Sequence, residues 1–99
     1  MGKVYVKTYI KGSQTLVTVC DTNLIGKTLR EGRVKLEVTS KFYGEQLATT
    51  EETVEALLKA DTGNIVGKNA VKVAVENKLV DPAAVIYIAG VPHVQFVRL

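Results

Sequence analysis

The sequence predicts an α+β fold: a single domain over residues 1–99, in which a mostly antiparallel sheet has two main helices packed on one face. Two observations lead to this prediction. Strand-like and helix-like segments come in runs, in the order β-β-β-α-α-β-β, whereas a doubly wound fold would alternate them. In addition, 99 residues with 46% hydrophobic content match the usual size of one domain and suffice for one core.

Three strands are predicted in the first half of the chain. Residues 3–11 alternate strictly between two kinds of side chain, which is the period of a half-buried strand. Gly12-Ser13 is a plausible turn, and the β-branched residues 15–20 follow as the hairpin partner. Residues 33–39 alternate again and are predicted to form a third strand.

Two helices are predicted in the middle of the chain. Thr49 and Glu52 match a capping box, so a short helix should begin there and end near Gly63. Asn64 is predicted to cap a second helix that continues to about Asn77.

The C-terminal part is predicted to contain one helical turn and two strands. Asp81-Pro82 is typical of a helix start, because proline suits the first helical position. Residues 85–89 and 93–98 are predicted strands, separated by a turn at Gly90-Val91-Pro92. We expect the core to join one face of the first strand to both helices, through Val4, Val6, Ile10, Leu57, Leu58, Val73 and Ala74.

Composition and charge narrow the function classes. The longest apolar runs are far below the roughly 18 residues that a spanning helix needs, and the N-terminus does not resemble a signal peptide, so we expect a cytoplasmic protein away from membranes. The net charge is +3, and residues 1–48 carry +4 while residues 49–99 carry −1. The basic surface is therefore predicted to belong to the first half.

The single cysteine, Cys20, rules out an internal disulfide and a multi-cysteine zinc site within one chain. This fits a reducing cytoplasm. Cys20, Asp21 and His93 are acceptable ligand types without metal-site spacing, and we expect no metal and no cofactor. Gly26-Lys27-Thr28 resembles the end of a phosphate-binding loop, but Asp21 stands where that motif requires its first glycine.

On one face of the first predicted strand, lysines alternate with tyrosines in a stripe, a pattern that can bind nucleic acid. Lysines attract phosphates, and tyrosine rings can stack on unpaired bases. A solvated outer face is an equally good explanation, and a dimer seam is a third. The stripe, which we call the Lys–Tyr stripe, consists of Lys3, Tyr5, Lys7, Tyr9 and Lys11.

Cys20 and Asp21, with the only histidine His93, come nearest to a catalytic set. A thiolate nucleophile needs a base and a group that orients the base. A cysteine at a strand end is more often a small buried residue, and an aspartate after it more often makes a turn. We therefore assign no catalytic residue and lean toward a protein that is not an enzyme.

Several short motifs together resemble an archaeal family of proteins of about a hundred residues, called domain of unknown function 424. They include Cys20-Asp21, Leu24-Ile25-Gly26-Lys27, Arg30-Glu31-Gly32, Phe42-Tyr43-Gly44 and Gly90-Val91-Pro92-His93 followed by Gln95. The resemblance implies an archaeal cytoplasmic protein and brings no mechanism. Its motif residues are candidate site residues: Cys20, Asp21, Lys27, Arg30, Glu31, Tyr43, Asn64, His93 and Gln95. We also predict that the Cys20-Asp21 and Gly90–His93 segments lie near each other.

Three functions remain open. The first is a binding module for RNA or a ribonucleoprotein, an accessory to translation or RNA handling. The second is a small enzyme or ligand-binding domain built on Cys20, Asp21, Lys27, Arg30 and His93. The third is an interaction domain that forms a homodimer through an edge strand.

Overall fold

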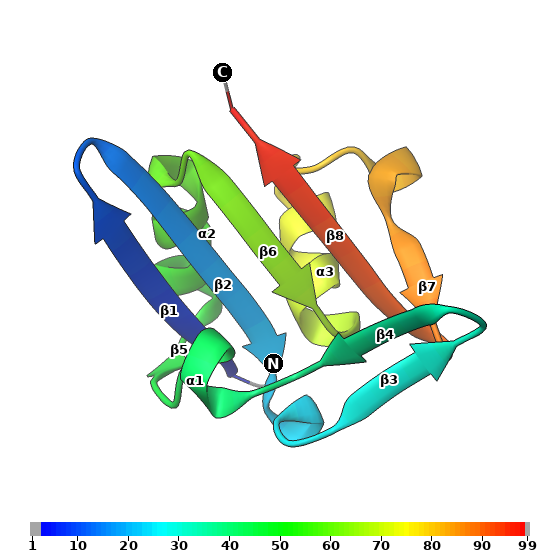
Figure 1. The fold of residues 1–99 in the computed structure, drawn as a ribbon. Helices are drawn as coiled ribbons and strands as arrows, with labels where there is room; N and C mark the ends of the chain where they lie inside the picture. Colours follow the sequence, from blue (N-terminus) through cyan, green and yellow to red (C-terminus); the bar gives the residue numbers. More distant parts are fainter. Residues whose placement is uncertain (1–2, 99) are drawn as a thin grey trace.

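The computed structural model describes residues 3–98 and confirms the α+β fold (Figure 1). Within these residues, six strands form one sheet, and β3 (Thr28–Glu31) and β4 (Val34–Glu37) form a separate hairpin. The sheet order is β5 (Leu47–Ala48), β1 (Val4–Lys11), β2 (Gln14–Asp21), β6 (Thr62–Val66), β8 (Val91–Val97) and β7 (Ile86–Ile88). The helices are α1 (Ser40–Tyr43), α2 (Thr50–Lys59) and α3 (Lys68–Glu76), with 3-10 turns at Thr22–Leu24 and Pro82–Ala84.

The sheet is mostly antiparallel, as predicted. β1 pairs antiparallel with β2 and with β5, and β8 pairs antiparallel with β6 and with β7. β2 and β6 are parallel, which requires a long connection between them. The hairpin, α1, β5 and α2 make up that connection.

The predicted second helix begins later than expected, because β6 precedes it. Asn64 lies in the middle of β6, so the prediction that it caps a helix is wrong. β6 is a central strand between β2 and β8, with both faces covered in part, and such strands lack a clear polar alternation. α3 instead starts after Gly67, which has a φ of +112°.

The third predicted strand is also different from expectation. Residues 33–39 contain β4, which leaves the main sheet and pairs with β3 alone. The alternation in this segment was a true strand signal, but alternation does not say which strand is the partner.

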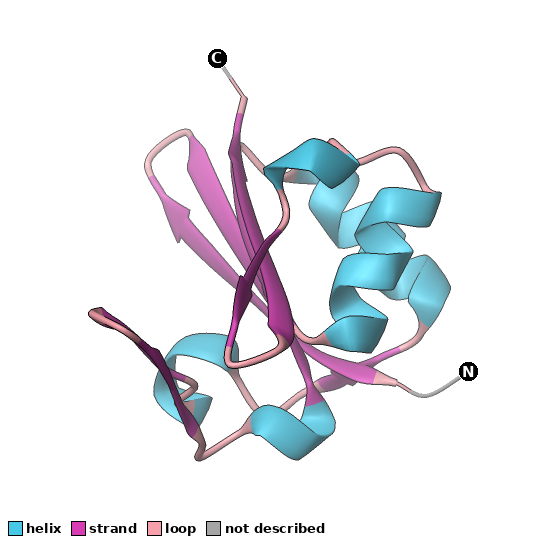
Figure 2. Cartoon of the chain, turned by 90° about the vertical axis from the view of Figure 1, so that its right-hand side faces the viewer, coloured by secondary structure: helices cyan, strands magenta, loops and turns pink. Residues whose placement is uncertain are grey.

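One face of the sheet is covered by α2 and α3 (Figure 2). Val4, Val6, Leu57 and Ala74 take part in this core, as predicted. The predictions for Ile10 and Leu58 are wrong, because these side chains are 74% and 61% exposed. Val73 is buried, although it lies outside this cluster.

The two exposed side chains lie at the margins of the covered area. Ile10 lies near the turn end of β1, beyond the two residues that pair with β5, and Leu58 lies in the last turn of α2. In the sequence, Ile10 and Leu58 follow the same apolar spacing as the buried residues, so the pattern alone could not show that they are exposed.

The opposite side of the sheet, which we call the open face, is covered only in part. There the hairpin and α1 pack over a second apolar cluster at one end of the sheet (Figures 1 and 2). The cluster consists of Cys20, Leu24, Leu29, Val38, Tyr43, Val66 and Ile88. No helix in the described part of the chain is long and apolar enough to cross a membrane.

Candidate functional site

Tyr5, Lys7, Tyr9 and Lys11 of the Lys–Tyr stripe lie on the open face, and α1 covers the middle of the stripe, whereas Lys3 precedes β1. Tyr5, Lys7 and Tyr9 point away from α2 and α3, because side chains alternate along a strand. Lys7 Nζ donates a hydrogen bond to the Lys41 carbonyl at 2.8 Å, and the Tyr9 hydroxyl donates to the Phe42 carbonyl at 2.6 Å. Both acceptors lie in α1, whose carbonyls lack partners further along a helix. Lys7 and Tyr9 therefore hold α1 on the sheet.

The exposed end of the stripe borders a hollow of about 520 Å³, which we call the aromatic hollow. The Tyr9 and Phe42 rings stack there, with centroids 5.9 Å apart and planes inclined by 28°. Lys11 and Gln14 are exposed at the rim, next to the β1–β2 turn. The remaining lining residues are Ile10, Thr15, Leu16 and Thr62. The hollow therefore combines a flat apolar surface with one ammonium group.

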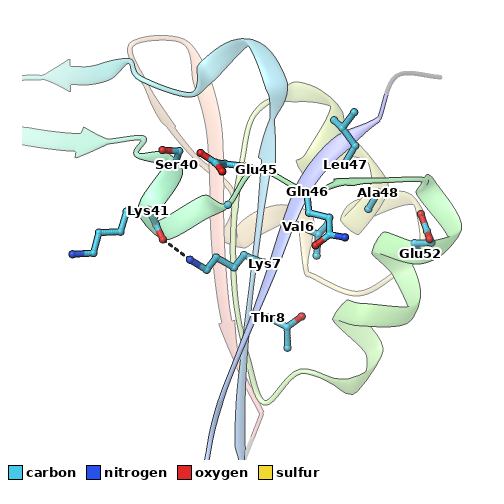
Figure 3. A pocket seen from close by; sticks show the side chains of 11 residues that line it. Val6, Lys7, Thr8, Ser40, Lys41, Glu45, Gln46, Leu47, Ala48 and Glu52 are labelled. Atoms are coloured by element: carbon cyan, nitrogen blue, oxygen red, sulfur yellow. Dashed lines mark hydrogen bonds between the residues drawn. The ribbon is translucent and has the colours of Figure 1, made fainter.

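A second, larger groove of about 930 Å³ runs along the edge of β1 (Figure 3). It arises because β5 pairs with only Val4 and Tyr5, which leaves the rest of β1 without a neighbouring strand on that side. Figure 3 shows Lys7 directed to the Lys41 carbonyl. Glu52 also lines the groove, and its carboxylate accepts from the Thr49 backbone N–H in the capping box. Of its four charged side chains, those of Lys7 and Glu52 thus already have partners in the fold.

Asp21 has a structural role at the start of α3. Its Oδ1 accepts from the Ala70 N–H at 2.8 Å, and its Oδ2 accepts from the Asn69 N–H at 3.0 Å. These donors are unpaired within the helix, and a carboxylate there also favours the helix dipole. A Cβ on Gly67 would overlap the Asp21 side chain, which explains the glycine. Asp21 is therefore a cap supplied from another element.

Cys20 is fully buried in the second apolar cluster, and its thiol donates to the Asp21 carbonyl at 3.1 Å. Burial, followed by the neighbouring Asp21 carboxylate, raises the pKa of the Cys20 thiol to about 12. A thiol with this pKa is almost entirely protonated at neutral pH, whereas nucleophilic attack needs the thiolate. The buried-residue interpretation of Cys20 is the one the structure supports.

Tyr43 and Asn64 meet on the open face. The Tyr43 hydroxyl donates to Asn64 Oδ1 at 2.7 Å, and burial raises the pKa of Tyr43. Gln95 is the register partner of Asn64 on β8, and its side chain is exposed. Three of the motif residues are thus brought together by strand pairing and by α1.

His93 lies in β8 and is 7% exposed. Its Nδ1 is 2.9 Å from the Ile65 carbonyl oxygen, and burial lowers the pKa of the imidazole. Cys20 pairs with Val66, which in turn pairs with His93. Two strand spacings of about 4.8 Å place the Cys20 and His93 backbones about 10 Å apart. The two segments are near each other, as predicted, but each side chain has a separate partner.

The remaining motif residues belong to the hairpin region. Lys27 and Arg30 are exposed, whereas the Glu31 carboxylate accepts from the Ala89 N–H at 2.7 Å and fastens the hairpin to the β7–β8 turn. Lys27 and Arg30 therefore do not converge with Cys20, Asp21 and His93 on one cavity. Among residues 3–98, no group of three His, Cys, Asp or Glu side chains could hold a metal ion.

Phe42 belongs to one of the sequence motifs but was not among the predicted site residues. It belongs to α1, where the Thr39 side chain accepts from the Phe42 N–H and Gly44 ends the helix with a φ of +87°. The sequence did offer a signal for this helix, because Thr39 is a typical N-cap residue and Gly44 a typical helix end, with four residues between them.

The fold and the site define a small α+β domain, with helices on one sheet face and a partly open opposite face. The chain belongs to the family of proteins of unknown function DUF424, whose model matches residues 9–99. An uncharacterized conserved protein from Methanopyrus kandleri, known from its crystal structure, has the same fold with a TM-score of 0.81. The two chains are 22% identical over 99% of this chain and 95% of the other. No curated protein matches the sequence.

Proposed function

We propose that this protein is a non-enzymatic module that binds single-stranded RNA, alone or within a ribonucleoprotein, and that the aromatic hollow receives a base. The observation that carries the proposal is the stacked Tyr9–Phe42 pair beside the exposed Lys11. Every base has a π-face that can stack on such rings, and an ammonium at the rim attracts the adjoining phosphate.

The charges around the hollow support this proposal. None of the described residues that line it is acidic, and the neighbouring Asp61 carboxylate is engaged by the N–H of the lining residue Thr15. Lys11 is exposed at the rim, and residues 1–48 carry a net charge of +4. A cytoplasmic role in archaeal RNA handling or translation is part of the same proposal.

The enzyme alternative has less support from the geometry. It needs Cys20 as a nucleophile and Asp21 as an orienting group, but the thiol is buried and the carboxylate caps α3. Lys27 and Arg30 lie apart on the hairpin region. The proposed candidate site is thus the open face and not this set of residues.

The test compares two variants of Tyr9 for binding of a fluorescently labelled oligouridine, measured by anisotropy. Tyr9→Phe and Tyr9→Leu both remove the hydroxyl that bonds to α1, but only Tyr9→Leu removes the ring. We expect Tyr9→Leu to bind more weakly than Tyr9→Phe by about 1 to 3 kcal/mol, the usual contribution of one stacked base.

Charge is tested separately with Lys11→Gln, and Lys72→Gln on the outer surface of α3 is the matched control. Lys11→Gln should reduce the slope of log affinity against log salt by about 0.7, the value for one phosphate contact on a single strand. Equal binding by both Tyr9 variants, or no binding by the folded wild-type protein at low salt, would contradict the proposal.

A further inference from the structure

The outer face of the β3–β4 hairpin carries charge that the fold does not neutralise. Leu29 and Leu36 pair across the hairpin and point into the second apolar cluster. Because side chains alternate, the neighbouring pair of Arg30 and Lys35 points outward. Two like charges directly opposite each other destabilise a strand pair.

The two acidic residues of the hairpin do not relieve this repulsion fully. Glu37 forms an ion pair with Lys35 at 3.0 Å. Glu31 is directed to the other side, where it accepts from the Ala89 N–H. Arg30 has no ion-pair partner among the described residues.

Two further cations extend the basic surface along the hairpin. Lys27 precedes β3, and Arg33 lies in the turn between the strands, and both are exposed. Residues 27–37 carry a net charge of +2, out of +3 for the whole chain. Figure 2 shows the hairpin on the side of the sheet opposite to α2 and α3, as a ribbon that stands off the sheet.

We propose that this outer face is a second binding surface, which holds the phosphate backbone of RNA through Arg30 and Lys35, with the exposed Lys27 at the base of the hairpin and Arg33 at its turn. The identity of the polyanion rests on the proposed function, but the surface is separate from the aromatic hollow. Arg30 and Lys35 lie side by side, and Lys27 and Arg33 lie at the two ends of the same hairpin, an arrangement that can follow a backbone and needs no base contact. It also assigns a role to Lys27 and Arg30, the motif residues of this region without an internal partner.

The test measures the salt dependence of oligouridine binding for Arg30→Gln, Lys35→Gln and the double variant. Lys59→Gln, which removes an exposed charge on α2, is the control. We expect the slope of log affinity against log salt to fall by about 0.7 for each hairpin substitution and to stay unchanged for Lys59→Gln. Tyr9→Leu should weaken binding without changing this slope.

The Tm of each variant, measured by a melting curve, distinguishes a binding role of these residues from a structural one. Relief of the Arg30–Lys35 repulsion should leave the Tm of Arg30→Gln equal or higher, whereas a clearly lower Tm would show that Arg30 supports the fold and overturn the proposal.

Heparin, tested with the same variants, separates this inference from the proposed function. If the wild type binds heparin through the hairpin charges but does not bind RNA, the surface stands as a polyanion site and the RNA function fails. If RNA binds and its salt slope is indifferent to all hairpin substitutions, the hairpin proposal is overturned and the aromatic hollow stands.

Discussion

Asp21 shows how one side chain can link two elements that are far apart in sequence. Its carboxylate at the end of β2 accepts from two backbone N–H groups of α3, where Gly67 offers no side chain of its own for capping. The same residue looked like a catalytic partner of Cys20 in the sequence, because a strand end is also where catalytic groups are often placed.

Asp21→Ala should lower the free energy of unfolding by about 1 to 2 kcal/mol, since a helix loses its cap and buried donors lose their acceptor. Urea denaturation measures this directly. Asp81→Ala, which removes an exposed cap from a 3-10 turn, is the comparison and should cost less. Equal losses in the two variants would contradict the assigned role of Asp21.

His93 should make the stability of the protein depend on pH. Burial lowers the pKa of the folded imidazole below its usual 6.5, so the unfolded chain takes up a proton first as the pH falls. The contribution of His93 to stability is therefore complete above the unfolded pKa and decreases as the pH drops through it. In urea unfolding at about pH 7 and about pH 5, the wild type should lose more stability than His93→Gln. An identical loss in both proteins would refute this assignment.

At the scale of elements, α2 is fixed at both ends by side chains. The capping box of Thr49 and Glu52 closes its start, as the sequence predicted. Its C-terminal end depends on Arg98, whose Nη1 donates to the Leu57 carbonyl at 2.8 Å and to the Ala60 carbonyl at 2.7 Å. The first contact is local and could be predicted, whereas the second joins residues about 40 positions apart and could not.

Arg98→Leu should destabilise the protein by about 1.5 to 3 kcal/mol, the usual contribution of hydrogen bonds made by a charged group. Arg33→Leu makes the same chemical change in an exposed turn and should stay within about 0.5 kcal/mol of the wild type. Amide hydrogen exchange should be faster at the end of α2 in Arg98→Leu alone. Unchanged exchange there would show that another contact holds this end.

Local signals account for the elements that the sequence predicted. The alternation of β1, the capping box of α2 and the Asp81 cap each lie within a few residues. β6 escaped prediction because a short central strand resembles a helix start when read alone. α3 kept its helical spacing, but its cap comes from β2, 48 positions away from Asn69.

At the scale of the whole molecule, the arrangement of the helices and the hairpin around the sheet determines which face is open to a ligand. α2 and α3 cover one face of the sheet, and the hairpin and α1 cover only one end of the other (Figure 2). The sequence indicated Tyr9 and Lys11, which share one strand. It could not indicate that Phe42 stacks on Tyr9, because that contact depends on how α1 docks on the sheet.

The central claim is that single-stranded RNA binds at the open face, in the aromatic hollow. Titration of ¹⁵N-labelled protein with oligouridine, followed by amide chemical shifts, tests it most directly. The largest shifts should fall on Tyr9, Lys11, Leu16, Phe42 and Thr62, while the outer surface of α2 and α3 stays unchanged. Amides that did not shift at saturating RNA, or shifts that gathered on α2 and α3, would contradict RNA binding at the open face.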